Sequence, residues 1–461
     1  MKHKKLICVL YVLVNLIPAY SFAFEVRTID GPDFWISALE DPDGEVLSWR
    51  EIQALNTEIT RNSISMKDIA GLPAEVTGAD LLSWILFDPL PCCDSGKWGR
   101  RYGASGMELS ESFFASLLEN MGIGNIDLMN PVEFGVVTEA QAVRAFPTDE
   151  AMLKSPESLG FDAAQYSMVF PGERAALLKR SRDKEWGFFQ LRDLRGWMRL
   201  KGLAFAEKAV ALRSERNFIV VLGSRVQVYR DKDRTMPASW LPMGTTLYLP
   251  DDYNGGAGLP YVAVLYPEAK EKGLSWTKAY VSRDADFSYG FLPYTKGNII
   301  RQAFKMLGEG YGWGGVDFKR DCSGFIKDIF ATVGINLPRN SREQSGAGAT
   351  QPHAGRLFTK EEIKQALAAS AKGITLVGLD GHVMLYVGDY EYRPFVIHQI
   401  FGYGDGAGFI RLNRAALTGL DIGGNSRSGA FIERITGINH IILPEPFNQT
   451  AGPGPLNAAA E

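Results

Sequence analysis

The chain holds few residues that could support cysteine or histidine chemistry, with four cysteines and five histidines among 461 residues. Cys322 stands in the segment Asp321-Cys-Ser-Gly-Phe-Ile, at the start of an apolar run with helical spacing. In the first turn of a helix, unpaired backbone N–H groups and the helix dipole favour a thiolate. The sequence therefore predicts a lowered pKa for the Cys322 thiol, although a free cysteine on an apolar helix is also commonly a core residue.

Two histidines farther along the chain could activate that thiol. His382 opens one strand-like run, and His398 lies inside the next, over residues 395–400. We expect these runs to form a hairpin with a three-residue loop around Tyr390, which would place the two histidines directly opposite each other, with Cβ atoms about 5 Å apart. One imidazole could then act as the base while the other orients it, as an activated cysteine requires.

Other chemistries fit the sequence less well. Cys322, His382 and His398 could bind zinc, but the chain has neither Cys-x-x-Cys nor His-Glu-x-x-His and offers no obvious fourth ligand. We therefore expect no metal and no cofactor. The Gly-x-Ser-x-Gly elbow of serine hydrolases is missing, and the glycines of residues 308–315 lack the Lys-Ser/Thr that follows in a phosphate loop.

The pattern of the surrounding elements changes along the chain. Residues 24–131 are expected to be mostly helical, with one apolar stripe at positions 109, 113, 117 and 121. Over residues 132–286 the apolar period is two, in short runs separated by turn residues, and a Trp-x-basic segment recurs at Trp197 and Trp276. This pattern predicts two consecutive small β-barrels. Helices and strands mix over residues 287–446, and the Gly-Pro-rich tail, residues 447–461, is expected to be disordered.

The first residues are typical of a secretory signal peptide. Three lysines precede the apolar run of residues 6–16, and small residues stand before a cleavage point after Ala23. A retained anchor helix is the alternative, but the run is short for a membrane span. We expect residues 1–23 to be removed and the protein to be secreted, in the periplasm, without a stable membrane anchor. Cys92 and Cys93 would then be either buried core residues or a strained pair, and at least one thiol stays unpaired.

The composition is that of a soluble globular protein. Hydrophobic residues make up 46% and charged residues 22% of the chain, and the formal net charge is −4. This balance gives no reason to expect a nucleic acid partner, which usually requires a basic face. The small number of cysteines and histidines excludes a disulfide scaffold and a protein with several zinc sites.

Together, several segments resemble the NlpC/p60 papain-like cell-wall peptidases. They are Tyr311-Gly-Trp-Gly-Gly, Asp321-Cys-Ser-Gly, Leu337-Pro-Arg-Asn-Ser-Arg-Glu-Gln, Gly381-His and His398. The upstream layout is similar to that of members with an N-terminal stabilising domain and two bacterial SH3-like domains. The resemblance implies a multidomain protein: a mostly helical domain over residues 24–131, SH3-like β-barrels over 132–207 and 208–286, and an α+β papain-like catalytic domain over 287–446.

The resemblance also implies an activity and residue roles. Members of this layout are γ-D-glutamyl-L-diamino-acid endopeptidases, which cut between D-Glu and diaminopimelate in peptidoglycan stem peptides. Cys322 would be the nucleophile, His382 the base and His398 the residue that orients it. Tyr311 would donate to the oxyanion region, or serve only as a packing aromatic. A non-catalytic peptidoglycan-binding protein, or an amidase or acyltransferase using the same residues, is the alternative. A monomer is expected.

Four further residues are expected to bind substrate: Asp321, Ser323, Asn340 and Ser341. Asp321 could equally be the N-cap of the Cys322 helix. Several family members hold a free N-terminal L-Ala with acidic residues, but the position before Ser341, where such an acid is expected, is Asn340. Either another acid replaces it, with Asp149 and Glu150 as candidates, or the requirement for a free amine is relaxed.

Overall fold

A computed structural model describes residues 28–86, 99–158, 160–213, 217–256, 258–350 and 359–444. The predicted signal peptide, Cys92, Cys93, His353 and the predicted tail lie outside the described residues. Within the described ranges, no helix is long and apolar enough to cross a membrane.

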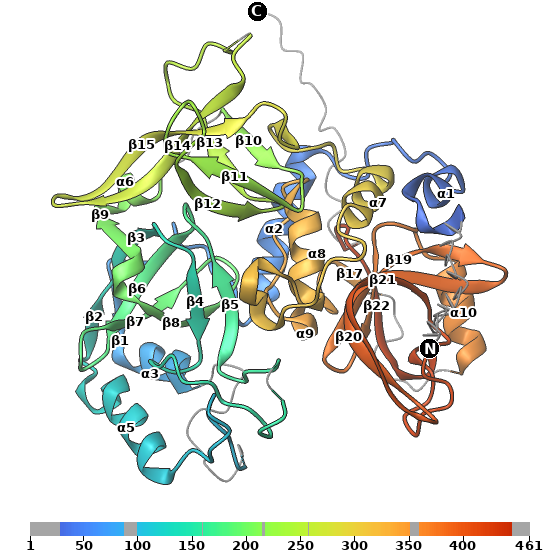
Figure 1. Ribbon diagram of the computed structural model, residues 1–461, viewed down its shortest axis with the longest axis horizontal. Helices are drawn as coiled ribbons and strands as arrows, with labels where there is room; N and C mark the ends of the chain where they lie inside the picture. The colour runs from blue at the N-terminus through green and yellow to red at the C-terminus, as the bar shows by residue number, and fades with distance from the viewer. Residues whose placement is uncertain are drawn as a thin grey trace, which may run out of the picture.

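The helices of the N-terminal segment pack against two different neighbours. Helices α1 (Pro32–Ser37) and α2 (Trp49–Asn62) share a core with the C-terminal domain, and α2 lies beside α8 in the middle of the molecule (Figure 1). Helices α3 (Gly78–Leu86) and α5 (Glu111–Met121) pack against the first β-rich unit. The other elements of this segment are short: η1 (Thr28–Asp30), β1 (Glu75–Thr77), η2 (Ile123–Asn125) and β2 (Met129–Pro131). The predicted helical character is therefore observed, but these helices contribute to two hydrophobic cores.

The first β-rich unit is a seven-stranded antiparallel sheet with strand order β5-β4-β8-β7-β6-β3-β9. Its aromatic residues Phe188 and Trp197 are fully buried. The strands are β3 (Glu133–Val137), β4 (Gln141–Arg144), β5 (Gln165–Val169), β6 (Arg174–Arg180), β7 (Trp186–Gln190), β8 (Arg195–Arg199) and β9 (Leu203–Ala206), with η3 (Leu200–Gly202) before β9.

The second β-rich unit begins after α6 (Lys208–Ala211) and consists of two sheets, with strand orders β12-β11-β15-β14 and β13-β10-β16, that enclose one core. The strands are β10 (Phe218–Val221), β11 (Arg225–Tyr229), β12 (Pro237–Pro242), β13 (Thr246–Tyr248), β14 (Tyr261–Lys270), β15 (Gly273–Ser282) and β16 (Phe287–Tyr289). In neither unit do the described strands close into a hydrogen-bonded ring, so SH3-like barrels are not confirmed.

The predicted repeat of the Trp-x-basic segments is not a structural repeat. Trp197 is buried in the core of the first unit, and Trp276, although it belongs to β15 of the second unit, packs against that same core. The β14–β15 hairpin reaches across to β9, where Gly273 approaches the Phe205 carbonyl. The two tryptophans therefore occupy different positions in their units.

The C-terminal domain is a six-stranded antiparallel sheet with helices on both faces. Helices α7 (Lys296–Phe304) and α8 (Cys322–Ala331) cover one face and α10 (Lys360–Ala368) packs on the other (Figure 1). The strand order is β17-β22-β18-β19-β20-β21. The strands are β17 (Ala349–Thr350), β18 (Thr375–Leu379), β19 (His382–Tyr390), β20 (Arg393–Asp405), β21 (Gly408–Gly419) and β22 (Ile435–His440); the remaining short helices are η4 (Trp313–Phe318), α9 (Ser341–Gln344) and η5 (Phe431–Arg434).

Strands β19 and β20 form the predicted hairpin, but the predicted register is wrong. The turn contains two residues, Glu391 and Tyr392, both with positive φ (50° and 61°), as a tight type I′ turn requires. A bulge between Tyr386 and Gly388 then shifts the pairing again. His382 consequently lies diagonally across from His398 on the same face of the sheet, a position from which long and aromatic side chains still touch.

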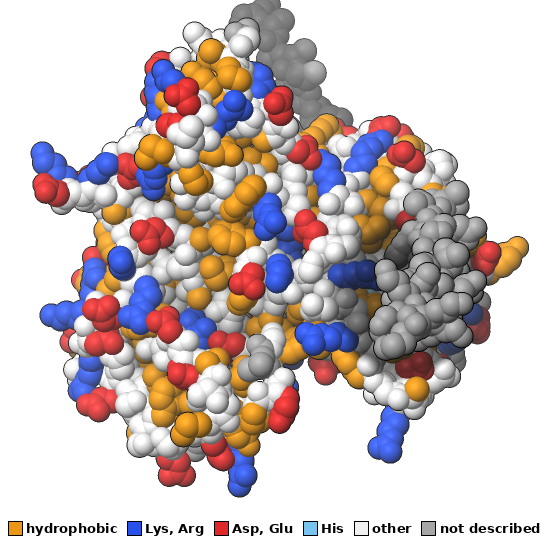
Figure 2. All heavy atoms as spheres, in the orientation of Figure 1, with side chains coloured by type: hydrophobic (Ala, Val, Ile, Leu, Met, Phe, Trp, Pro, Cys, Tyr) orange, Lys and Arg blue, Asp and Glu red, His pale blue; other side chains and the backbone are white. Residues whose placement is uncertain are grey.

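The face of the molecule seen in Figure 2 carries interspersed basic and acidic side chains, with hydrophobic side chains between them. No single sign of charge dominates this view.

Candidate active site

Cys322 is the first residue of helix α8, as predicted. Asp321 is the N-cap of this helix, and its Oδ1 accepts a hydrogen bond of 2.8 Å from the Gly324 N–H. This observation confirms the capping alternative for Asp321. The helix forms here because the cap satisfies its first turn and the apolar face that follows, with Phe325 and Ile329, is fully buried.

The predicted lowering of the Cys322 pKa is wrong for the structure as it stands. The residue is 7% exposed, and burial raises the pKa of its thiol to about 12, with the neighbouring Asp321 charge adding to the effect. Hydrogen bonds from the backbone of Val383 and Ser323 favour the thiolate but do not offset the lost hydration. The resting cysteine is therefore a protonated thiol lying against the backbone of the residue that follows His382.

The two histidines form a direct hydrogen bond. His382 Nε2 and His398 Nδ1 are 2.7 Å apart, and His398 Nε2 lies 3.1 Å from the Thr418 hydroxyl on β21. If His382 Nδ1 is to take a proton from the thiol, its Nε2 must carry hydrogen and donate to His398. His398 Nε2–H then donates to Thr418, so this chain of contacts favours one tautomer for each ring.

Both histidines are neutral at neutral pH. Burial, together with the positive charge of Arg434, lowers the pKa of His382 to about 4. Burial, with the neighbouring His382, holds the pKa of the fully buried His398 well below its usual range. His382 is thus unprotonated and able to act as a base.

Tyr311 lies in an aromatic cluster beside Cys322. Its ring contacts Phe161 and Phe401, with centroid distances of 6.1 and 5.9 Å, and Phe161 also packs against Trp313. Burial raises the pKa of the Tyr311 hydroxyl, as do the nearby Cys322 and Asp321. The hydroxyl therefore keeps its proton and can donate it in a hydrogen bond. Phe161 belongs to the first β-rich unit, so that unit forms one wall of the cluster.

A buried arginine ties the residues around Cys322 together. Arg339 donates to Asp321 Oδ2 at 2.7 Å, to the Ser323 hydroxyl at 2.9 Å and to the Ser167 hydroxyl of β5 at 2.8 Å. Asp321 and Ser323 thus serve this internal network; their predicted contact with substrate stays a prediction. The sequence alone indicated no role for Arg339.

Asn340 also has a structural partner. It is the N-cap of α9, with Oδ1 accepting from the Glu343 N–H at 2.9 Å and Nδ2 donating to Glu343 Oε1 at 2.8 Å, and Ser341 is the first residue of that helix. The candidate replacement acids are also engaged. Asp149 pairs with Arg199, and Glu150 accepts from the Ala104 N–H at 2.7 Å.

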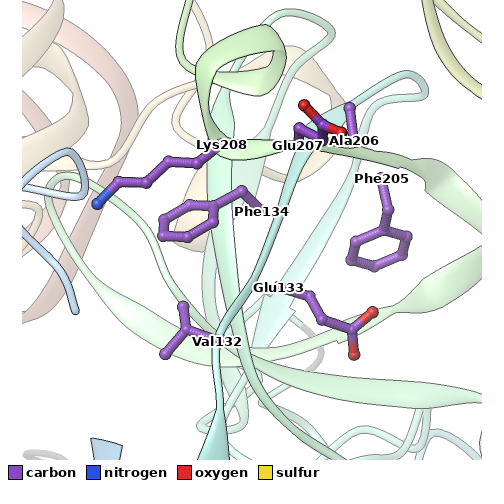
Figure 3. A pocket seen from close by; sticks show the side chains of 7 residues that line it. All are labelled: Val132, Glu133, Phe134, Phe205, Ala206, Glu207 and Lys208. Atoms are coloured by element: carbon purple, nitrogen blue, oxygen red, sulfur yellow. The ribbon is translucent and has the colours of Figure 1, made fainter. Parts of the chain in front are cut away.

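The described surface has two hollows, of which one includes a residue of this site. A shallow groove of about 390 Å³ on the first β-rich unit is separate from the Cys322 residues, and Lys208 lies over the ring of Phe134 there (Figure 3). A cavity of about 360 Å³ includes Thr418 in its lining. In the part of the chain that the structure describes, no three His, Cys, Asp or Glu side chains are grouped to hold a metal ion.

Comparison with known proteins places a family domain over these residues. Residues 308–399 match the model of the NlpC/P60 family. The bifunctional muramidase/DL-endopeptidase CwlT of Bacillus subtilis is 43% identical over 51 residues, 11% of this chain and 16% of that protein. The gamma-D-glutamyl-L-lysine dipeptidyl-peptidase of the same organism is 38% identical over 101 residues, 20% of this chain and 30% of that protein. The matches thus span less than a third of either relative.

A solved structure extends the similarity to most of the chain. An NlpC/P60 endopeptidase from Photobacterium damselae subsp. piscicida superposes with a TM-score of 0.67, covering 89% of this chain and 96% of that one at 20% identity. At this identity the comparison shows a shared fold. Cys322, His382 and His398 all lie within residues 308–399, the segment that matches the NlpC/P60 family model.

Proposed function

We propose that this protein is a cysteine peptidase that hydrolyses the γ-D-glutamyl–diaminopimelate bond of peptidoglycan stem peptides. The observation that carries the proposal is the hydrogen-bonded His382–His398 pair beside the thiol of a helix-start cysteine. The relatives named DL-endopeptidase and gamma-D-glutamyl-L-lysine dipeptidyl-peptidase support this class of bond.

The reaction would proceed through a thioester. His382 Nδ1 takes the thiol proton as Sγ attacks the γ-D-glutamyl carbonyl, and the Tyr311 hydroxyl with backbone N–H groups near Cys322 donates to the developing oxyanion. His382 then gives that proton to the leaving amine of the diamino acid. A water molecule, deprotonated by His382, attacks the thioester; the D-glutamyl γ-carboxylic acid leaves and the thiol regains its proton.

The same proposal includes the location of the enzyme and the role of its β-rich units. The enzyme would act outside the cytoplasm on murein peptides, after removal of residues 1–23, with the two β-rich units acting as SH3-like domains beside the site. The contact of Phe161 with Tyr311 and Trp313 supports a part for the first unit in shaping the site.

The proposal is tested with the tripeptide L-Ala-γ-D-Glu-meso-diaminopimelate. The native enzyme should release L-Ala-D-Glu and free diaminopimelate, identified by mass spectrometry. Cys322→Ala should lower kcat by about 10³-fold or more, because the nucleophile is lost. Full activity in Cys322→Ala, with an unchanged circular dichroism spectrum, would refute the assignment, and an acyl adduct on an added amine in place of the free acid would indicate a transferase.

We further propose that the requirement for a free N-terminal amine is relaxed. Asn340 supplies no charge and its amide is occupied by Glu343, while Asp149 is paired with Arg199. Acetylation of the L-Ala amine should therefore change kcat/KM by less than about threefold, since no buried ion pair is lost. A loss of a hundredfold or more on acetylation would show that another acid holds the amine.

A further inference from the structure

Arg434 ends helix η5 next to the catalytic histidines. Its guanidinium lies over the ring of Phe431, 5.4 Å from the centroid. Phe431 in turn packs edge-on against His382 and His398, with centroid distances of 6.1 and 6.2 Å. A single aromatic ring thus separates an arginine from the base and from the residue that orients the base.

Within the described ranges of the chain, no acidic side chain balances the charge of Arg434. The side chain is exposed, and no carboxylate of the described residues lies within ion-pair distance of it. Two other arginines of this domain differ in this respect: Arg339 is paired with Asp321, and Arg320 with Asp328. The Arg434 charge lowers the pKa of His382, so it opposes the protonation that His382 must undergo during the reaction. An anion bound at Arg434 would remove this opposition.

The substrate of the proposed reaction supplies a suitable anion. The inference rests on that proposed function: His382 delivers a proton to the leaving nitrogen of the diamino acid, and Arg434 lies next to His382 across the Phe431 ring. In a stem peptide that ends at the diamino acid, a free α-carboxylate is attached to the carbon that bears this nitrogen. A guanidinium binds a carboxylate through two parallel hydrogen bonds.

We propose that Arg434 binds the free α-carboxylate of the diamino acid on the leaving side, so that the enzyme prefers stem peptides that end at this residue. The Phe431 ring holds the guanidinium in place beside the reacting bond. Stem peptides extended beyond the diamino acid carry an amide at this position and lose the ion pair.

The test compares the native enzyme and variants at position 434 on two substrates. The native protein and Arg434→Gln are assayed on L-Ala-γ-D-Glu-meso-diaminopimelate with a free α-carboxylate and on the same peptide with an α-carboxamide. The native enzyme should favour the free acid by about tenfold in kcat/KM, as expected for a charge-assisted hydrogen-bonded pair. In Arg434→Gln the ratio should fall to about one, and Arg434→Lys, which keeps the charge but not the fork, should give an intermediate ratio.

Arg427→Gln is the matched control, since Arg427 is an exposed arginine of the segment that leads into η5. It should leave the ratio unchanged, and thermal unfolding should show that each variant is folded. The role of Arg434 is overturned if the native enzyme cuts both peptides equally, or if the kcat/KM ratio of Arg434→Gln equals the native ratio. Neither result contradicts the proposed peptidase function. Failure of the native enzyme to cut either peptide overturns the proposed function instead.

Discussion

At the scale of single residues, burial determines the protonation states of Cys322 and His382. The thiol of Cys322, with a pKa of about 12, and the imidazole of His382, with a pKa of about 4, are both neutral in the resting site. A preformed thiolate–imidazolium pair would require the pKa of the thiol to lie below that of the imidazole. In the proposed reaction the proton would therefore move from sulfur to nitrogen as the carbonyl is attacked.

The pKa values of Cys322 and His382 predict the pH dependence of kcat/KM. His382 must be unprotonated to act as the base, so activity should be constant through neutral pH and fall only as the pH drops toward about 4. The charged or titratable groups around His382 are Arg434 from η5, His398 from β20 and Cys322 from α8. Arg434→Gln removes the like charge and should move the acidic limb to higher pH. An acidic limb near 6.5, the value of an unperturbed histidine, would contradict this account.

Thr418 should act as a positioning residue through His398. Replacing it with valine leaves the Nε2–H of the buried His398 without an acceptor, which should lower kcat about tenfold with little change in KM. Thr418→Ser keeps the hydroxyl and should recover most of the activity. If the serine variant loses as much as the valine variant, Thr418 contributes only packing.

At the scale of the elements, the sequence could predict the strands and the helix but not how they fit together. The rarity of cysteine and histidine identified Cys322, His382 and His398, and apolar spacing placed them on a helix and two strands. The register of β19 and β20 depends on a two-residue turn and a bulge at Gly388, which alternation of apolar residues does not reveal.

Some residues that contact the site belong to common residue types in distant segments, and the sequence did not identify them for a different reason. Thr418, Arg339 and Arg434 belong to residue types that occur throughout the chain, so composition does not single them out. Each becomes meaningful only through a tertiary contact: with His398, with Asp321, and with Phe431 beside His382. The prediction of a lowered pKa for the Cys322 thiol was wrong because burial raises that pKa. The helix dipole can be predicted from the sequence, but the depth of burial cannot.

The start of helix α8 depends on Asp321 in two separable ways. Asparagine caps helices as well as aspartate, but Asp321→Asn leaves the buried guanidinium of Arg339 without its counter-charge. Breaking a buried pair in this way costs roughly 3–5 kcal/mol of unfolding free energy. Asp321→Ala should lose about 1 kcal/mol more, for the cap. Urea unfolding measures both, and an asparagine variant as stable as the native protein would show that the ion pair contributes nothing.

At the scale of the whole molecule, both β-rich units hold the region around helix α8. The first unit bonds to Arg339 through Ser167 and to Lys327 through Asp193, the latter ion pair measuring 2.7 Å. From the second unit, the Ser224 carbonyl accepts a hydrogen bond of 2.6 Å from Arg320, two residues before Cys322. Figure 1 shows α8 between these units and the C-terminal sheet. The β-rich units are therefore part of the scaffold that positions the thiol.

The contact between the first unit and α8 should make stability depend on pH. Glu173 of the first unit faces Lys327 of α8 across this contact, near Asp193 of its own unit, and loss of hydration raises the pKa of its carboxyl to about 7. The unfolded chain releases that proton near pH 4.3, so the stability that protonated Glu173 contributes is complete below about pH 4.3 and is lost as the pH rises toward about 7.

Glu173→Gln removes this pH-dependent loss of stability because glutamine does not ionise. The variant should therefore melt higher than the native protein at pH 8, by about 3 °C or more, with a difference that shrinks steadily toward pH 5. The matched control is Glu207→Gln, which changes an exposed carboxylate of the first unit and should not reproduce the gain in melting temperature of Glu173→Gln at pH 8. Thermal unfolding at intervals from pH 5 to 8 measures the difference. A constant gap between Glu173→Gln and the native protein would mean that Glu173 ionises as readily in the folded state as in the unfolded chain, and that the contact of the first unit with α8 does not sense pH.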